Sequence, residues 1–421
     1  MRRQNELPYG LDMNRRVVIT GLGLVTPLGL GVVENWDALI HGRSGIDRIT
    51  RFDASEFRVQ IAGEVKGFDV GDYLDRKKAK AMGLFTHYAI AATQMAVRDA
   101  GLEVGKENPE RIGVVIGTAM GGMQETEEGY RRFLQRGPRR VSPFAGPRML
   151  LNMAAGEVAI LLGAKGPVNC TATACSAGAH AIGDAFKYIQ LGYADVMIAG
   201  GSEASITPYY VAGFDATGAL SHRNDEPQRA SRPFDRERDG MVLGEGAGVL
   251  VLEEHERARR RGAPIYAELV GFGTTSDAHS PVIPDPEGGA RCMLMALSDA
   301  RLSPDQVDYI NAHGTATHYN DWHETLAIKA AFKDHSRRLK ISSTKSMTGH
   351  LSGAAGAVEA AFCALVIKHG VIPPTINYEY PDPACDLDYT PNEACPWDVK
   401  VALSNSMGFG GSNASLIFKK V

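Results

Sequence analysis

Short hydrophobic runs that end in glycine recur along the chain. Arg16–Thr20 and Ile265–Val270 are rich in β-branched and aliphatic residues, and a Gly-x-Gly follows each of them directly. Runs of this kind predict buried strands that lead into loops. A second pair, Ile112–Gly117 and Val307–Ala312, has a similar apolar character. The spacing therefore predicts strands of the same kind in both parts of the chain.

A helical pattern precedes each strand of the second pair. The predicted helices are Thr86–Ala100 and Ala290–Ala300. The repeated order predicts two related α/β halves, residues 15–262 and 263–421, with largely parallel sheets covered by helices. We expect residues 1–14 to be a disordered leader, and the proline-rich segment Ser276–Gly289 to be a loop.

Composition narrows the class of protein. The 421 residues are 44% hydrophobic and 22% charged, with a net charge of -4, which argues against a surface that coats nucleic acid or anionic membrane. No apolar run reaches the ~18 residues of a spanning helix. Six cysteines without CxxC spacing favour a reducing compartment, so we expect a cytoplasmic protein. The 47 glycines indicate many sharp turns or close approaches to the backbone.

Several common motifs are absent from the sequence. It contains no GxGxxG, GxxxxGK[ST], GxSxG or HExxH, which disfavours dinucleotide, P-loop, α/β-hydrolase and zincin chemistry. His313, His318 and His323 are five residues apart, a spacing more typical of scattered loop histidines than of a metal site.

Cys175 is the strongest candidate nucleophile. It lies in a stretch of small residues between a predicted strand, Gly166–Cys170, and a predicted helix that runs to about Tyr188. A helix N-terminus favours the thiolate, and small neighbours leave room for a substrate. A buried structural role is the alternative, and it is the one we expect for Cys170 and Cys363.

Three further stretches of small residues carry reactive side chains. They are Asn311–Thr317, Ser342–Gly356 and Ser404–Asn413. The first two place His313 and His350 beside Gly and Thr. The glycine-rich third stretch predicts either a source of backbone N–H groups for an oxyanion or a tight turn.

In this order the four stretches resemble the condensing enzymes of the thiolase fold, in particular the β-ketoacyl-acyl-carrier-protein synthase II family. The similarity spans almost the whole chain and includes the segment Leu220–Gly248. It implies an α/β, thiolase-like fold of two pseudo-duplicated halves in a layered αβαβα arrangement. It also implies a decarboxylative Claisen condensation in fatty acid elongation, in which malonyl-acyl carrier protein extends an acyl chain on Cys175 to a 3-oxoacyl product.

The resemblance assigns roles to the reactive side chains. His313 and His350 would donate N–H groups to the enolate of the malonyl thioester, and Lys345 would orient the site with support from Glu359. The backbone N–H groups of Cys175 and Phe409 would form the oxyanion hole, and Phe409 would gate access to the thiol.

Further positions follow from the same resemblance. Thr315 and Thr317 would bind the phosphopantetheine arm, while Met120 and Ala145 would influence chain length. No cofactor is expected to be required, but a monovalent cation, Na⁺ or K⁺, is expected at four residues: Asn311, Glu359, Ser404 and Asn413.

Partners follow as well. We expect an acidic acyl carrier protein, acyl and malonyl thioesters as substrates, and a homodimer whose interface completes the acyl tunnel. Candidate docking patches are Arg76–Lys80 and the pairs Arg131–Arg132 and Arg139–Arg140, each of which is as consistent with a solvated face.

Two departures and three alternatives accompany the resemblance. His318 replaces the usual Pro, and Met407 replaces the usual Phe beside the gating loop. A polyketide or specialised-lipid ketosynthase would use the same residues. A non-catalytic chain-length factor would lack Cys175, and a thiolase would carry a second cysteine near Gly408–Gly410.

Overall fold

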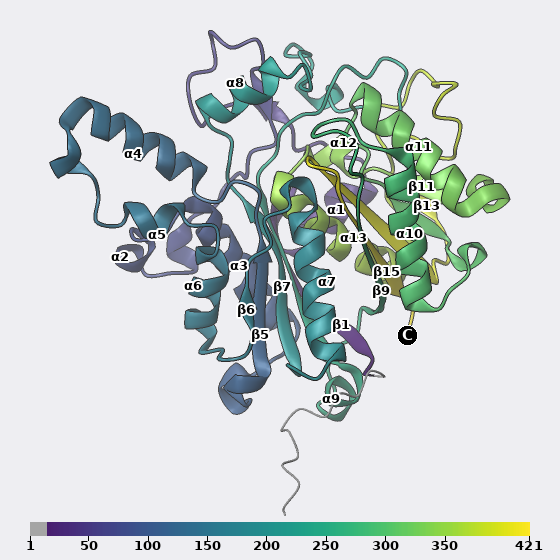
Figure 1. Ribbon diagram of the computed structural model, residues 1–421, viewed down its shortest axis with the longest axis horizontal. Helices are drawn as coiled ribbons and strands as arrows, with labels where there is room; N and C mark the ends of the chain where they lie inside the picture. The colour runs from purple at the N-terminus through teal and green to yellow at the C-terminus, as the bar shows by residue number, and fades with distance from the viewer. Residues whose placement is uncertain (1–14) are drawn as a thin grey trace, which may run out of the picture.

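Two halves with the same strand order make up the central sheet of the computed structural model (Figure 1). The structure describes residues 15–421, so the leader predicted for residues 1–14 lies outside the described residues. The first half runs β6-β5-β7-β8-β1 and the second runs β11-β10-β14-β15-β9. The strands are β1 (Val17–Thr26), β5 (Ile112–Gly117), β6 (Val168–Asn169), β7 (Val196–Glu203), β8 (Gly246–Glu254), β9 (Ala267–Ser276), β10 (Tyr309–Asn311), β11 (Lys340–Ser342), β14 (Val401–Gly408) and β15 (Ser412–Lys419).

Both halves mix parallel and antiparallel pairs. β5 pairs in parallel with β6 and β7, and β10 does the same with β11 and β14. The pairs β7–β8 and β8–β1, with their counterparts β14–β15 and β15–β9, are antiparallel. The prediction of largely parallel sheets was wrong. β14 and β15 form a direct antiparallel hairpin, and β8 runs antiparallel to both β7 and β1 although α8 lies between β7 and β8 in the chain.

Helices form three layers around the two half-sheets. α3 (Leu84–Asp99) and α6 (Met153–Leu162) cover one outer face, while α10 (Pro286–Ala300) and α11 (His318–Phe332) cover the other. α7 (Ala177–Gln190) and α13 (Ala355–His369) lie between the half-sheets, and every residue of α13 but the last two is buried. The predicted layered, pseudo-duplicated fold is confirmed.

Glycines let the outer helices approach β1 and β9 at equivalent positions. A Cβ on Gly23 would lie 1.8 Å from the Ala92 carbonyl oxygen of α3, and one on Gly273 would lie 2.1 Å from that of Cys292 in α10. The strands therefore continue through the glycines that were predicted to end them, because glycine here serves close packing rather than a turn.

Two other predicted boundaries were wrong. α10 begins at Pro286, inside the segment predicted to be a loop, because proline fits the first position of a helix and Asp285 caps it. The strand predicted at Gly166–Cys170 is reduced to the two exposed residues of β6.

The other elements are short or lie on the surface, and α4 extends away from the body of the molecule (Figure 1). Within residues 15–421 no helix is both long and apolar enough to cross a membrane. The remaining helices and strands are α1 (Val32–Ile40), α2 (Arg76–Ala79), α4 (Met123–Arg136), α5 (Ala145–Met149), α8 (Pro208–Ala216), α9 (His255–Arg260), α12 (Lys345–Thr348), β2 (Gly29–Leu30), β3 (Asp47–Arg48), β4 (Ile61–Ala62), β12 (Val371–Ile372) and β13 (Cys395–Pro396).

Candidate functional site

Cys175 lies in a single 3₁₀ turn, Ala174–Ser176, that leads into α7. Its side chain is buried and lines a cavity of about 350 Å³ that also contains His313 and His350. Ala174 holds a left-handed φ of 52°, a strained conformation that aims the following residue at the cavity. The small residues predicted around the thiol therefore form a tight elbow that presents it.

Burial raises the pKa of the Cys175 thiol to about 11. The Lys345 ammonium and the backbone N–H groups of Phe409 and Cys175 act in the opposite direction but do not overcome burial. The backbone N–H groups thus favour the thiolate, as expected, but loss of water on burial is the larger effect and leaves the pKa above its usual value. The two N–H groups expected in the oxyanion hole both act on this sulfur.

His313 and His350 come from different loops and meet edge to face. Their ring centroids are 5.2 Å apart, with an angle of 86° between the planes. Burial lowers the pKa of each well below the usual value, and the nearby Lys345 lowers it further. Both imidazoles are therefore neutral at physiological pH and each carries one N–H to donate.

Lys345 connects His313 to Glu359. Its Nζ lies 3.4 Å from His313 Nδ1 and 2.5 Å from Glu359 Oε1, and its side chain is only 2% exposed. Burial raises the pKa of Glu359 to about 7, although Lys345 opposes the shift. Because an ammonium only donates, it holds His313 as the tautomer with its proton on Nε2.

Thr315 and Thr317 line the mouth of the same cavity. Their hydroxyl oxygens are 3.0 Å apart, and Thr317 also caps α11. His318 and Met407, the two departures from the family pattern, line the cavity too. His318 is the first residue of α11, a position where proline is favoured. The helix still begins there with histidine in place of the usual proline.

Phe409 stands partly exposed at the cavity. Its ring stacks on Phe214 of α8 with centroids 5.9 Å apart, and Phe214 packs in turn on Tyr210. An aromatic column thus lies beside the thiol, with Phe409 at its outer end.

The two predicted chain-length residues lie away from this cavity. Met120 packs against the hydrophobic cluster that contains Tyr210. Ala145 begins α5 and is half-exposed beside the extended helix α4. Neither residue is among those that line the cavity in the described chain.

Two of the four residues predicted for a cation are neighbours in the sheet. Asn311 and Ser404 are paired across β10 and β14. Within residues 15–421, the side-chain oxygens Asn311 Oδ1, Ser404 Oγ and Glu359 Oε2 are buried without a hydrogen-bond partner. Asn413 lies apart from them. Its amide donates to Asp277 Oδ1 at 2.6 Å, and it is three residues before Leu416, the residue of β15 that pairs with Ser404.

Buried acids support the reactive loops, and sequence reasoning missed them. Glu324 of α11 accepts the backbone N–H groups of His313 and Gly314, both at 2.8 Å. Glu203, at the end of β7, accepts N–H groups from two other loops. The sequence did carry a signal for each: Glu203 ends an otherwise apolar strand, and Glu324 lies on the helix that follows the His313 loop.

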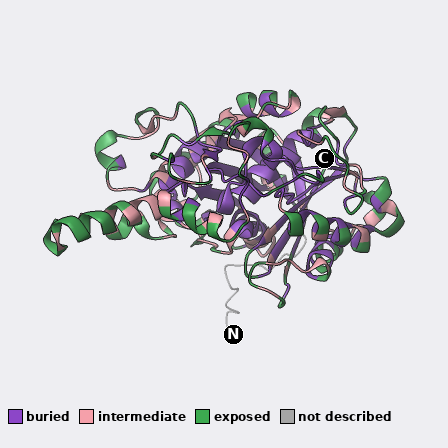
Figure 2. Ribbon diagram, turned by 90° about the horizontal axis from the view of Figure 1, so that it is seen from above, coloured by how far each residue is buried: buried purple, intermediate pink, exposed green. Residues whose placement is uncertain are grey.

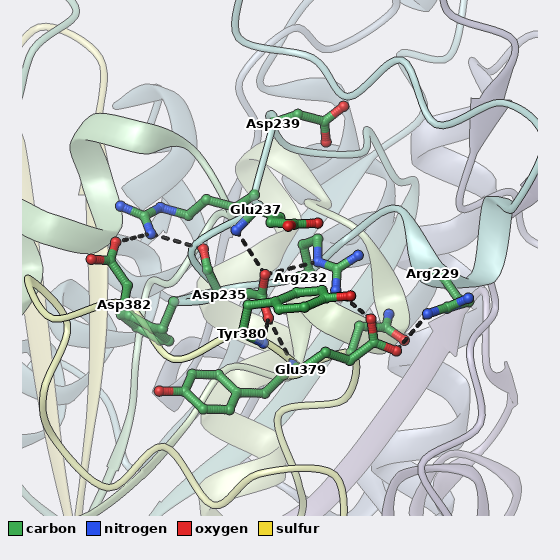
Figure 3. Close-up of polar contacts among 12 residues, drawn as sticks. Arg229, Arg232, Asp235, Glu237, Asp239, Glu379, Tyr380 and Asp382 are labelled. Carbon is green, nitrogen blue, oxygen red and sulfur yellow. Dashed lines mark hydrogen bonds and ion pairs between the residues drawn. The ribbon is translucent and has the colours of Figure 1, made fainter.

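An ionic network braces the loop that carries Thr315 and Thr317 (Figure 3). Arg238 donates to the carbonyl oxygens of Thr317 and His318 and to Asp382, whose carboxylate lies 2.6 Å away. Asp235 accepts N–H groups from Glu379 and Tyr380, and Arg232 bridges Asp235 and Glu379. This network fastens the connecting segment Leu220–Gly248 to the C-terminal half.

Within residues 15–421, no group of three or more His, Cys, Asp or Glu side chains is arranged to hold a metal ion. All six cysteines are free thiols, and Cys363 is fully buried on α13.

Comparison with known families shows which family the chain belongs to. Residues 14–258 match the family described as "Beta-ketoacyl synthase, N-terminal domain", and residues 266–379 match "Beta-ketoacyl synthase, C-terminal domain". The chain belongs to the β-ketoacyl synthase family. The resemblance seen in the sequence is thereby confirmed.

Relatives of this β-ketoacyl synthase match over nearly the full length. A protein named 3-oxoacyl-[acyl-carrier-protein] synthase 2 from Synechocystis sp. is 53% identical over 96% of the chain and 98% of the relative. A protein of the same name from Staphylococcus aureus is 51% identical over 97% and 99%.

Solved structures agree with this β-ketoacyl synthase in fold. A β-ketoacyl synthase from Burkholderia phymatum superposes with a TM-score of 0.90 at 39% identity, covering 97% of this chain and 100% of that one. The ketosynthase of a type II polyketide synthase, solved in complex with its acyl carrier protein, gives a TM-score of 0.90 at 39% identity, covering 97% and 99%.

Proposed function

We propose that the protein condenses malonyl-acyl carrier protein with an acyl chain bound to Cys175, and so forms the 3-oxoacyl-acyl carrier protein of fatty acid elongation. The observation that carries the proposal is the convergence of the Cys175 thiol with two neutral imidazoles, His313 and His350, in one cavity. The relatives at 51–53% identity are named for the same activity.

In the first half-reaction the Cys175 sulfur attacks the thioester carbonyl of the acyl carrier protein. The backbone N–H groups of Cys175 and Phe409 stabilise the oxyanion, and the carrier thiol leaves with the proton that Cys175 gives up. Because the pKa of the thiol is about 11 in the free site, proton removal accompanies substrate binding rather than preceding it.

In the second half-reaction malonyl thioester loses CO₂, and negative charge develops on its carbonyl oxygen. His313, held with its proton on Nε2 by Lys345, donates to that oxygen together with His350. The resulting carbanion attacks the acyl-Cys175 carbonyl and the sulfur departs. The carbon–carbon bond to the departing CO₂ and the acyl carbon–sulfur bond break, one new carbon–carbon bond forms, and the released Cys175 thiolate takes up a proton from solvent.

A polyketide ketosynthase is the second candidate, because solved ketosynthases of that kind share the fold at 38–39% identity. The fatty acid relatives are more similar, which favours the first function. A chain-length factor is disfavoured because Cys175, His313 and His350 are all present and face one cavity.

Carrier docking is proposed at the exposed arginines and lysines around the long helix α4. Arg131, Arg132, Arg139 and Arg140 are exposed on or beside this helix, which Figure 2 shows as a largely exposed arm. The cluster Arg76–Lys80 lies on and beside α2. Basic patches steer an acidic carrier even when the net charge is negative.

A homodimer is proposed along the outer edge of β6. Val168 is 46% exposed on this edge strand and Ile160 of α6 is 74% exposed, so unpaired backbone and apolar surface coincide. A second copy paired there would also bring Ala145 of the partner toward the acyl tunnel, which gives that residue its proposed effect on chain length.

A monovalent cation is proposed at Asn311, Ser404 and Glu359, since Asn311 Oδ1, Ser404 Oγ and Glu359 Oε2 are buried without a hydrogen-bond partner among the described residues. When bound, the ion would offset the charge of Glu359 and hold β10 and β14 together behind the histidines. Replacing K⁺ and Na⁺ with tetramethylammonium is expected to lower the melting temperature of wild type, but not that of Ser404→Ala.

The condensation is tested by incubating the protein with acyl- and malonyl-acyl carrier protein and measuring 3-oxoacyl product and CO₂ by mass spectrometry. Wild type is expected to form the product, and Cys175→Ala to form neither acyl-enzyme nor product. Acyl transfer that survives in Cys175→Ala would contradict the proposal. Release of CO₂ alone is a poor readout, because it does not require the thiol.

A further inference from the structure

Glu203 is a buried carboxylate that the condensation does not use. It is the last residue of β7 and is fully buried where the two halves meet. Its charge contributes to the raised pKa of the Cys175 thiol, so it lies near the reacting sulfur.

The carboxylate holds the loop that carries Met120. It accepts the N–H of Ala119 at 2.8 Å, the N–H of Met120 at 3.3 Å and the Thr118 hydroxyl at 3.4 Å. The same hydroxyl oxygen accepts the N–H of Gly121 at 3.1 Å. Hydrogen bonds to an ionised acceptor are strong, so one side chain determines where this loop lies.

The same carboxylate also reaches the other half of the molecule. It accepts the N–H of Gly353 at 3.2 Å, in the turn that follows His350. Ser352 in that turn has a strained φ of 46°, and its hydroxyl lies 3.1 Å from Tyr210 Oη. Strain of this kind persists only where several contacts enforce it.

The two loops also touch directly. A Cβ on Gly353 would lie 2.3 Å from the backbone nitrogen of Ala119, so no side chain fits between them. Gly353 therefore allows the Met120 loop and the His350 loop to touch, and Glu203 accepts N–H groups from both loops where they meet.

We propose that Glu203 is a positioning residue that locks the loop Thr118–Gly121 onto the turn after His350, and that this lock sets which acyl chain lengths are elongated. The inference rests on the proposed condensation. Met120 packs against the cluster containing Tyr210, beside the aromatic column that leads to the thiol. A loosened loop lets Met120 move away from Tyr210, and we expect longer chains to enter the space that opens there, next to the cavity rather than within it.

The test measures kcat/KM for a series of saturated acyl carrier proteins from short to long. Glu203→Gln keeps the size of the side chain but presents an amide N–H₂ to backbone donors. Thr118→Val removes the hydroxyl that the loop donates to Glu203, and it provides the test if Glu203→Gln folds poorly. Both are expected to shift the long-to-short ratio of kcat/KM toward long primers, on the order of threefold to tenfold.

Glu253→Gln is the matched control. Glu253 is equally buried at the far end of the same β7–β8 ladder, where it bonds Thr20, Arg257 and Arg261. This variant is expected to melt at a lower temperature yet keep the wild-type chain-length ratio. A merely structural role for Glu203 would instead give the same pattern in Glu203→Gln.

Two results would overturn the inference. One is an unchanged ratio in both Glu203→Gln and Thr118→Val, and the other is an equal shift in Glu253→Gln. If the wild-type protein condenses normally, either result would refute the role of Glu203 in chain-length selection and would leave the proposed function standing. A wild-type protein that condenses no primer would overturn the proposed function together with it.

Discussion

Cys175 shows how burial and polar contacts compete at a single residue. Burial of the thiol raises its pKa to about 11, while Lys345 and the Phe409 N–H work against that rise. Burial thus favours the neutral thiol in the free site, and the nearby positive charge and N–H donors limit the rise in its pKa.

This state predicts the pH dependence of alkylation. Since the thiolate is the reacting form and the pKa lies near 11, the rate of Cys175 modification by iodoacetamide should rise about tenfold per unit from about pH 7 to about pH 10. The rate is followed by mass spectrometry of the peptide that contains Cys175. Lys345→Met, which removes a charge that favours the thiolate, should react more slowly. A plateau below about pH 8 would contradict the raised pKa.

Glu203 predicts a pH-dependent difference in stability. Burial raises its pKa from 4.5 to about 7 in the folded protein. A raised pKa contributes stability that is fully present below the unfolded pKa and is lost as the pH rises through the folded one. Relative to Glu203→Gln, wild type should thus lose roughly 3 kcal/mol in free energy of unfolding between about pH 4.5 and pH 7. Denaturant titration at both pH values measures the change, and a constant difference would contradict it.

At the scale of elements, the equivalent pairs β1–α3 and β9–α10 account for the repeat. Gly23 and Gly273 each face the outer helix closely. A Cβ added at either glycine would lie less than 2.2 Å from a backbone carbonyl oxygen of that helix. The two halves thus share their strand order and also the glycine contact that sets the distance between helix and sheet.

Alanine at either glycine is expected to be costly. Gly23→Ala and Gly273→Ala should each lower the free energy of unfolding by about 3 kcal/mol, because backbone cannot yield as a flexible side chain does. Gly105→Ala is the control, since an added Cβ there meets nothing within 4 Å. Chemical denaturation measures all three. A loss at Gly23 or Gly273 no larger than at Gly105 would rule out the close packing.

At the scale of the whole molecule, reactive residues of both halves meet in one cavity. Cys175 comes from the first half, while His313, Lys345 and His350 come from the second. Duplication followed by packing around α7 and α13 therefore builds the site at the junction. The exposed edge of β6 marks the surface where a second copy is proposed to join.

Association along this edge makes a direct prediction. Val168→Lys places a charge on the apolar edge strand and should convert the proposed dimer to a monomer, as seen by sedimentation velocity. Val33→Lys alters a residue of α1 that is even more exposed, and should leave the assembly unchanged. A wild-type monomer, or a dimer that tolerates Val168→Lys, would refute this interface.

The sequence by itself determined the family, the two-half organisation and the reactive side chains. These depend on residue type and order along the chain, as in the stretches around Cys175, His313 and His350. Only the tertiary structure decided the state of the thiol, the exclusion of Asn413 from the proposed cation group, and the contacts of Glu203. Burial and hydrogen-bond geometry arise where distant segments meet, as when Glu203, Ala119 and Gly353 converge. No local pattern encodes such distances, because the packing of both halves sets them together.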